Sequence, residues 1–345
     1  MTKQNNPLQL DFIMPAEWEK HSAVWLAWPY DKTTFPERVE KVEQKYAEII
    51  KALSCGEVVK LLVLDEEMKK RAESVLKKAG VEMPQVIFFV TLYADVWIRD
   101  YGPTFIKNNK QVASVKWNYN VYGLKFPDLL KDNEVFLNLK DAVGVEMFQP
   151  SIFMEGGAIE VNGQGTLITT KQCLLNPNRN PNLNIKQTEE YLKSNLGVNN
   201  IVWLEEGLIN DHTDGHVDDI VKFVNEDTIL CAYEDNPSDE NFVILDNNYK
   251  VLEKSLDQNG KSFNLVKLPM PHMNYADGTK APVSYANFYI GNKVVLVPTY
   301  NDPSDATALQ IISSYFKDRK TIGIDCRDII YGGGAIHCIT QQQPL

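Results

Sequence analysis

A cysteine near the C-terminal end of the chain is the first residue whose type and setting could do chemistry. Cys338 follows three consecutive glycines, Gly332 to Gly334, and the segment between them reads Ala-Ile-His. Glycine permits backbone conformations and close approaches that larger residues forbid, so we expect this run to lead a short strand, residues 336–340, against a bound ligand. There the sulfur would act as a nucleophile. The alternative is a tight turn with a small buried cysteine.

The densest polar segment is Asp211-His-Thr-Asp-Gly-His-Val-Asp-Asp219, which runs into an expected strand at residues 220–224. If its last residues are extended, His216 and Asp218 lie on one face and could act on the same ligand. A metal site is the main rival, because His212, His216 and Asp218 are suitable ligands for Zn²⁺ or Mn²⁺. A metal site, a metal-free catalytic pair and a solvated loop all stay open on this segment alone.

Two shorter motifs each contain one candidate carboxylate. In the motif WIRDYGP, Asp100 either binds a ligand or pairs with Arg99 to stabilise the Gly-Pro turn. In the motif FMEGG, Glu155 either faces a ligand or caps a turn beside the two glycines. Neither motif is decisive by itself.

The candidate residues together indicate the charge of the substrate. A cysteine, a histidine and three carboxylates carry more negative charge than hydrolysis of a neutral amide or ester requires, so we expect a cation. A planar guanidinium group fits best, because two carboxylates can each accept paired N–H bonds and hold its central carbon over the sulfur. His337 would face the opposite side of a strand from Cys338, so it is predicted to be structural.

The rest of the chain must position these side chains, and its pattern predicts an α/β fold. Strands outnumber helices about two to one, which indicates units of two or three strands per helix in one domain spanning residues 1–345. A helical face is clearest at Val39, Val42, Tyr46, Ile49 and Leu53, and further helices are expected near 66–79, 187–196 and 304–316. The predicted strands are 58–64, 86–90, 112–117, 167–170, 201–204, 220–224, 229–232, 265–268, 294–297 and 322–324.

Composition narrows the class of protein. The chain has 345 residues, 44% of them hydrophobic, and a net charge of 35 − 46 = −11 with no basic run, so nucleic acid and anionic membranes are not expected as partners. It has neither an apolar run long enough to span a membrane nor a signal-like N-terminus, which predicts a cytoplasmic protein. The five cysteines are scattered without CxxC spacing, so neither disulfides nor a thiolate metal cage is expected.

Seven motifs, in order along the chain, resemble the agmatine deiminase family of the guanidine-modifying (pentein) superfamily, with which Porphyromonas-type peptidylarginine deiminases are also grouped. They are WIRDYGP, FMEGG, CLLNPNRNP, DHTDGHVDD, YANFYIGN, PTYNDPSD and GGGAIHCITQQ, and the resemblance covers residues 14–344. It implies a five-fold pseudosymmetric α/β propeller of ββαβ units around a central site. It also implies hydrolysis of agmatine, a small cationic guanidine, to N-carbamoylputrescine and ammonia, with no cofactor and no metal; a homo-oligomer is left open.

The same resemblance implies a role for each polar candidate. Cys338 would be the nucleophile that forms a covalent amidino intermediate, and His216 would be the general acid and base. Asp100 and Asp218 would clamp the guanidinium group, and Glu155 would contact it and orient His216.

Aromatic residues are expected to contact the remainder of the substrate, and here the chain departs from the family pattern. Trp97 would pack against the aliphatic part of the substrate. Tyr122 lies where the family commonly has a Trp-Gly pair, and it keeps an aromatic face but is smaller and adds a hydroxyl. Ala335 replaces the asparagine of GGGNIHC. Free arginine and peptidyl-arginine are therefore alternative substrates.

Two other classes of function compete with guanidine deimination. One is a metal-dependent hydrolase built around His212, His216 and Asp218, and the other is a non-catalytic binder of guanidines or polyamines with a decayed site. The presence of all five polar site residues argues against decay. We also expect Cys338 to be weakly reactive until substrate binds, because nearby carboxylates oppose formation of its thiolate.

Overall fold

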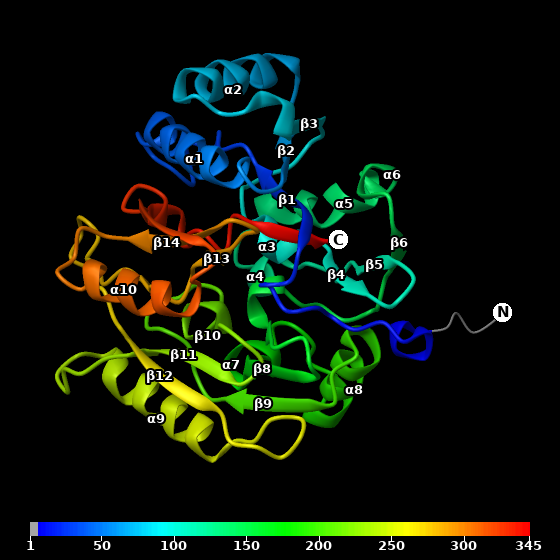
Figure 1. Ribbon diagram of the computed structural model, residues 1–345, viewed down its shortest axis with the longest axis vertical. Helices are drawn as coiled ribbons and strands as arrows, with labels where there is room; N and C mark the ends of the chain where they lie inside the picture. Colours follow the sequence, from blue (N-terminus) through cyan, green and yellow to red (C-terminus); the bar gives the residue numbers. More distant parts are fainter. Residues whose placement is uncertain (1–5) are drawn as a thin grey trace.

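Five small sheets surround a common centre, with helices on the outside, in the computed structural model, which describes residues 6–345 (Figure 1). Four of these sheets have three strands and one has four. In each sheet an antiparallel pair is followed, after one or more helices, by a strand parallel to the second member of the pair. This propeller-like repetition of ββαβ units confirms the predicted fold.

The first unit is completed by the end of the chain. β16 (Gln341–Pro344) pairs antiparallel with β1 (His21–Ala27), which pairs in parallel with β2 (Val58–Val63). β3 (Val86–Val90) adds a further parallel strand, and α1 (Val39–Leu53) and α2 (Glu66–Ala79) connect the three. Because β16 completes the first sheet, Cys338 is held beside the first segments of the fold.

The other four units follow one another along the chain. The second contains β4 (Thr104–Lys107), β5 (Val112–Val115), β6 (Glu146–Phe148), α4 (Val121–Leu124), α5 (Val135–Asn138) and α6 (Lys140–Val143). The third contains β7 (Glu160–Val161), β8 (Thr166–Thr170), β9 (Asn200–Leu204), α7 (Lys171–Leu174) and α8 (Ile185–Leu196). The fourth contains β10 (Val221–Phe223), β11 (Thr228–Tyr233), β12 (Asn264–Pro269) and α9 (Asn241–Lys254); the fifth contains β13 (Tyr289–Ile290), β14 (Val294–Thr299), β15 (Lys320–Asp325) and α10 (Asp305–Tyr315).

Local sequence explains where the outer helices begin and which face they bury. At the start of α2, Asp65 accepts a hydrogen bond from the backbone N–H of Met68, and Gly80 ends the helix in the left-handed conformation. α1 buries the predicted stripe of Val39, Val42, Tyr46, Ile49 and Leu53. Burial of this stripe holds α1 against the sheet of its unit.

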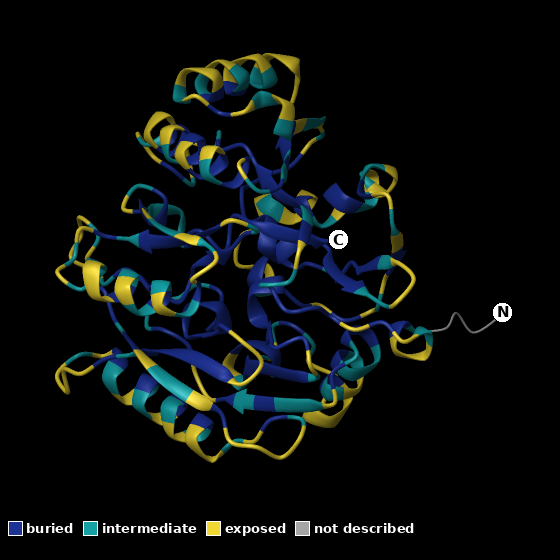
Figure 2. Cartoon of the chain, viewed as in Figure 1, coloured by how far each residue is buried: buried dark blue, intermediate teal, exposed yellow. Residues whose placement is uncertain are grey.

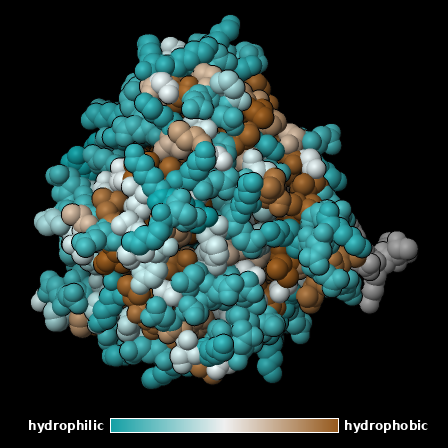
Figure 3. All heavy atoms as spheres, in the orientation of Figure 1, coloured by the Kyte–Doolittle hydropathy of each residue, from teal (hydrophilic) through white to brown (hydrophobic). Residues whose placement is uncertain are grey.

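The strands around the centre are largely buried, while the helices expose their outer faces (Figure 2). All five residues of β8 and all three of β10 are buried. The face of the molecule drawn in Figure 3 is mostly hydrophilic, with scattered apolar side chains. Within residues 6–345, every helix is too short or too polar to cross a membrane.

The local structure at the centre differs from expectation in two places. Residues 336–339 form turns, so the strand begins at Gln341 rather than before Cys338. Asp218 lies on a 3-10 helix, Val217–Asp219, so the extended segment considered for it is not formed. In both places hydrogen bonds between residues three apart replace strand pairing. Asp100 lies on the short helix α3 (Ile98–Tyr101).

Several elements were not predicted from the sequence, namely the strands β1, β4, β6, β7, β13 and β16, the four-residue helices α3 to α7, and the 14-residue helix α9. β7 and β13 have two residues each, too few to display an alternating pattern. β1 is buried on both faces, so its residues do not alternate between apolar and polar.

Candidate active site

Five turns at the centre of the propeller carry the candidate residues. Each turn lies directly before the first strand of a unit, and the five contain Asp100, Gly157, Asp218, Asn287 and Cys338. Gly157, Asp218 and Cys338 each precede the first residue of β7, β10 and β16 by three positions. The pseudosymmetry of the fold therefore brings five segments that are distant in sequence to one place.

A glycine makes this convergence possible. A Cβ atom at Gly157 would lie 2.5 Å from His216 Nδ1, 2.9 Å from Asp100 Oδ1 and 3.1 Å from Asp218 Oδ2. Any larger residue would push these three side chains apart. The N–H of Gly157 also donates to Asp100 Oδ1 at 3.0 Å. The motif FMEGG thus needs its second glycine because the backbone passes among the charged side chains.

The sulfur of Cys338 faces one of the carboxylates. Its Sγ lies 4.0 Å from Asp218 Oδ2, and the residue is 7% exposed. A Cβ atom at Gly334 would lie 3.0 Å from this sulfur and 2.7 Å from Trp97 Cζ3. The third glycine of the run therefore lets the backbone pass between Cys338 and Trp97, as expected from the sequence, although a turn rather than a strand makes the approach.

Electrostatics favour the thiol form of Cys338. Burial raises the pKa of this thiol well above its usual value, and the charges of Asp218, Asp219 and Asp100 raise it further. A thiolate can form here only when positive charge enters the site. This direction agrees with the weak reactivity expected before substrate binds.

Asp100 and Asp218, the two residues predicted to clamp the guanidinium group, are both buried, and they differ in their hydrogen-bond partners. Tyr122 donates its hydroxyl to Asp100 Oδ2 at 2.8 Å. Burial raises the pKa of Asp100 to about 6, with His216 opposing the rise and Asp218 adding to it. Asp218 Oδ2 contacts His337 Nδ1 at 2.7 Å, whereas its Oδ1 is buried without a hydrogen-bond partner. An unpartnered carboxylate oxygen is costly, and a guanidinium N–H would satisfy it.

Burial would raise the pKa of Asp218, but hydrogen bonding to His337 and the positive charges around it lower the pKa overall. Asp218 is therefore the more strongly anionic of the two clamp residues.

His216 lies between two carboxylates. Its Nδ1 is 3.6 Å from Asp100 Oδ1 and its Nε2 is 3.8 Å from Glu155 Oε2. Burial alone would lower the pKa of His216, but the charge of Asp100 and the neighbouring Cys173 and Glu155 side chains raise it well above its usual value. The imidazole is thus held as a cation that can give up a proton during a reaction.

Arg179 is a site residue that was not singled out from the sequence, although its motif CLLNPNRNP was. It is 2% exposed, and its Nε donates to Glu155 Oε1 at 2.9 Å. Burial would raise the pKa of Glu155, but Arg179 and His216 outweigh burial and lower it. Arg179 therefore keeps Glu155 ionised. By binding Oε1, it also orients the carboxylate so that Oε2 faces His216.

His337 contacts the same oxygen of Asp218 that lies 4.0 Å from the sulfur, and it belongs to a second charged cluster. Besides Asp218, it contacts Glu17 Oε2 and Lys222 Nζ, each at 2.8 Å from its Nε2. Lys222 also contacts Glu17 at 2.8 Å and Glu160 at 3.4 Å. We call Glu17, Glu160, Lys222 and His337 the supporting cluster.

The aromatic candidates surround the same site. Trp97 packs against Gly334 and donates its indole N–H to Asp95 at 3.0 Å. Tyr122 is buried with a φ of 60°, a left-handed conformation that is rare for a bulky residue. Ala335 is also buried, at 1% exposure.

The alternative metal site is not supported by the geometry of its residues. Among residues 6–345, the groups of three whose donor atoms lie within 4.8 Å of one another are Glu155, Cys173 and His216, and Glu234, Asp239 and His272. His212 does not join His216 and Asp218 in such a group. Its ring instead packs against Tyr122 and Phe126, with centroids 5.4 Å apart in both contacts.

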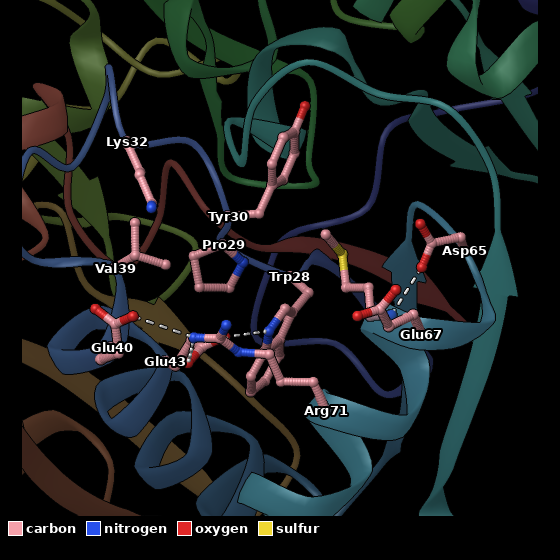
Figure 4. Close-up of a pocket in the computed structure, with 11 residues that line it drawn as sticks. Trp28, Pro29, Tyr30, Lys32, Val39, Glu40, Glu43, Asp65, Glu67 and Arg71 are labelled. Carbon is pink, nitrogen blue, oxygen red and sulfur yellow. Dashed lines mark hydrogen bonds and ion pairs between the residues drawn. The ribbon is translucent and has the colours of Figure 1, made fainter.

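A separate cleft of about 280 Å³ lies between α1 and α2 (Figure 4). Arg71 crosses it to pair with Glu40 and Glu43. None of the predicted site residues lines this cleft.

Comparisons with known proteins show the family to which the chain belongs. The family model described as Porphyromonas-type peptidyl-arginine deiminase matches residues 13–344. A Legionella pneumophila protein is 37% identical over 100% of this chain and 98% of its own. The agmatine deiminase of Stutzerimonas stutzeri is 34% identical over 99% of this chain and 98% of its own.

Solved structures of agmatine deiminases are also similar to this chain over nearly its whole length. The agmatine deiminase of Enterococcus faecalis has a TM-score of 0.92 and 30% identity, covering 99% of this chain and 98% of that one. An amidinotransferase from Microseira wollei, at 15% identity and a TM-score of 0.51, shares the fold alone. The chain therefore belongs to the Porphyromonas-type peptidyl-arginine deiminase family.

Proposed function

We propose that this protein hydrolyses agmatine to N-carbamoylputrescine and ammonia through a covalent amidino-cysteine intermediate. The observation that carries this proposal is the arrangement around Cys338, whose sulfur lies beside one buried carboxylate with an unpartnered oxygen, near a second carboxylate and a cationic histidine. The names of relatives with 30–34% identity over nearly the whole chain support agmatine as the substrate.

The first step is binding of the guanidinium group between Asp100 and Asp218. Each carboxylate can accept N–H bonds from the planar cation and so hold its central carbon near the sulfur. The added positive charge offsets the carboxylates around Cys338, which lowers the pKa of the thiol, and its proton is released to solvent. Substrate binding thereby creates the nucleophile.

The thiolate of Cys338 then attacks the guanidinium carbon to form a neutral tetrahedral adduct. The imidazolium of His216 donates its proton to one NH₂ group, the C–N bond breaks, and ammonia leaves. A cationic amidino thioether and a neutral His216 remain. Glu155, held by Arg179, keeps the imidazole oriented for this transfer.

Water completes the reaction. Neutral His216 accepts a proton from a water molecule, whose oxygen adds to the amidino carbon. The C–S bond then breaks, the hydroxyl proton is lost, and the ureido product and the Cys338 thiolate are released. The sum is guanidinium plus water giving a urea and ammonium.

Charge around the site favours agmatine over free arginine. The pKa of Asp219 is raised well above its usual value by burial and by the charges of Asp218 and Asp211, so further negative charge nearby is unfavourable. Free arginine would bring a carboxylate that agmatine lacks. Peptidyl-arginine carries a neutral amide at that position, and its exclusion depends on the space around Tyr122 and Ala335.

Kinetics with agmatine, arginine and an arginyl peptide test the substrate. We expect kcat/KM to be roughly 100-fold or more higher for agmatine than for arginine, because juxtaposed like charges cost several kcal/mol. Comparable turnover of all three compounds would refute the agmatine assignment and leave the deiminase chemistry intact. In Cys338→Ala, kcat/KM for agmatine should fall by more than roughly 10⁴-fold, and mass spectrometry should detect no covalent adduct. Cys55→Ala is the matched control, since Cys55 is exposed.

Four further expectations remain proposals. We propose a single domain over residues 1–345, a cytoplasmic location, a small guanidine as the partner, and no binding of nucleic acid or membranes by a chain with a net charge of −11. A homo-oligomer is left open, and light scattering of the purified protein would decide it.

A further inference from the structure

The proposed reaction requires a thiolate at a position where carboxylates oppose it. Asp218 Oδ2 lies 4.0 Å from the sulfur, and Asp219 and Asp100 add further negative charge. The guanidinium substrate offsets this charge on binding, but it is consumed as the reaction proceeds. The thiolate must also be stabilised as the leaving group of the second half-reaction, so a donor that belongs to the protein is needed.

Asn287 supplies a hydrogen-bond donor to this sulfur. Its side-chain Nδ2 lies 3.1 Å from Cys338 Sγ, and the residue is fully buried. It lies in the motif YANFYIGN, in the turn directly before β13. No role was assigned to this residue from the sequence.

The orientation of the Asn287 amide is determined by its other contact. The backbone N–H of His337 donates to Asn287 Oδ1 at 3.0 Å and lies 3.2 Å from the Asn287 backbone carbonyl. A backbone N–H can only donate, so the side-chain oxygen must face His337 and the NH₂ group must face the sulfur. The same amide thus holds the residue preceding the nucleophile and points at the nucleophile itself.

The symmetry of the fold places Asn287 among the proposed site residues. The corresponding turns of the other units carry Asp100, Gly157, Asp218 and Cys338, all at the centre of the site. Asn287 is the contribution of the fifth unit. Each of the five turns therefore supplies one residue to the reaction centre.

We propose that Asn287 is a catalytic residue whose side-chain N–H donates to the sulfur of Cys338 and stabilises its thiolate, both during attack and as the leaving group. The inference rests on the proposed function of Cys338. No bond is made or broken at Asn287, because its proton stays on nitrogen throughout.

A neutral amide suits this task better than a cationic side chain. Lysine or arginine at this position would stabilise a thiolate, but it would also pair with Asp218 and repel the guanidinium group. An amide N–H stabilises the anion without competing for the clamp. Asparagine therefore separates stabilisation of the sulfur from recognition of the substrate.

Two substitutions at Asn287 test the proposal. Asn287→Asp keeps the shape and the acceptor for His337 N–H but removes the donor to sulfur, and Asn287→Ala removes the donor without adding charge. Asn248→Asp is the matched control, since Asn248 is 1% exposed and its side chain also bonds backbone groups, the N–H of Glu205 and the carbonyl of Glu206. Thermal unfolding of all three variants measures the cost of a buried carboxylate alone.

We expect kcat for agmatine to fall roughly 10- to 100-fold in Asn287→Ala, with KM little changed, and further in Asn287→Asp. The second measurement is alkylation of Cys338 by iodoacetamide as a function of pH, followed on its peptide by mass spectrometry because the exposed Cys55 would react as well. The pH midpoint should move upward in both variants. In a Cys338→Ala background, Asn287→Ala should leave agmatine binding unchanged.

A folded Asn287→Ala protein with an unchanged alkylation profile would overturn the proposal, as would a rise in KM at constant kcat. Asn287→Ala decides the matter if Asn287→Asp does not fold. Alkylation needs no substrate, so failure of the agmatine assignment would be seen in the kinetics of the unsubstituted protein and not in this profile.

Discussion

Two clusters of buried charge meet at Asp218, and they differ in how completely their atoms are paired. In the supporting cluster, Lys222 contacts Glu17, Glu160 and His337, and the pKa of Glu17 is lowered despite its burial because Lys222, His337 and Arg99 are close. Around Cys338, by contrast, the carboxylates outnumber the cations. Within residues 6–345, Asp218 Oδ1 and His216 Nε2 are buried there without hydrogen-bond partners.

This difference indicates that the supporting cluster has a structural role, whereas the groups around Cys338 are available for catalysis. A paired cluster holds its members in place and has no capacity left for a ligand. Among the described residues around Cys338, Asp218 Oδ1 lacks a donor and the carboxylates lack one balancing cation, and a guanidinium group would supply both. Asp218 belongs to both clusters: His337 holds one of its oxygens, and the other stays available for substrate.

The largest effect should come from the unpaired side. Replacing His216 with Asn removes the proton donor for ammonia, so we expect kcat to fall roughly 10²- to 10⁴-fold. His212→Asn is the matched control and should change kcat little, because His212 packs against aromatic rings. Steady-state kinetics with agmatine measure both.

The metal-dependent alternative predicts a different pattern. Two results would favour a metal-dependent hydrolase over the cysteine mechanism. His212→Asn would lose as much activity as His216→Asn, and EDTA would abolish activity that Zn²⁺ or Mn²⁺ restored. We expect activity to persist in EDTA.

The supporting cluster should affect stability before it affects chemistry. Lys222→Met leaves Glu17 and Glu160 without their buried partner, which we expect to lower the free energy of unfolding by about 3 to 5 kcal/mol. Lys250→Met is the control, because Lys250 pairs with Asp246 on the surface and its loss should matter little. Urea denaturation measures both variants. If Lys222→Met abolished turnover at unchanged stability, the division between the clusters would fail.

The smallest expected effect is a pH dependence set by Asp100. Its pKa of about 6 means that the clamp is increasingly protonated, and therefore weaker, as pH falls through 6, so kcat/KM should decline there. Tyr122→Phe removes a hydrogen bond that lowers this pKa, and the midpoint should move to higher pH. The pH profile of kcat/KM for agmatine measures the shift. A midpoint that moved downward in Tyr122→Phe would contradict this account of Asp100.

A raised pKa also affects stability, but with the opposite dependence on pH. A carboxylate whose pKa is higher in the folded than in the unfolded state binds more protons when folded, so its contribution to stability declines as pH rises between the two values. For Asp100 this window extends from its ordinary pKa of 3.8 to about 6. As pH rises through this window, Asp100 therefore binds the guanidinium group more strongly, while its contribution to the stability of the fold declines.

The sequence motifs anticipated the composition of the site better than its local geometry. Cys338, His216, Glu155, Asp100 and Asp218 do lie together, although their individual roles remain proposals. The strand predicted at Cys338 and the extended segment considered at Asp218 are turns, because at the centre of the propeller a short turn places its side chain inward just before each strand begins.

Some participants could not be found without the fold. Asn287, Arg179 and Lys222 are distant in sequence from the residues they contact, and as single residues they have no distinguishing pattern. Arg179 lay in a motif of the resemblance, but only its 2.9 Å contact with Glu155 assigns it a partner. The strands of two residues carried no periodic signal for the same reason, since pairing rather than pattern defines them.

By itself, the sequence determined the chemistry that is available: one cysteine after a glycine run, a histidine, three carboxylates and an acidic chain that suits a cation. Its pattern also indicated units of two or three strands per helix. The tertiary structure alone decided which atoms of those residues are left without partners, because hydrogen-bond pairing depends on contacts between turns of different units. Charge type is a property of each residue, whereas an unsatisfied donor or acceptor exists only once the chain has folded.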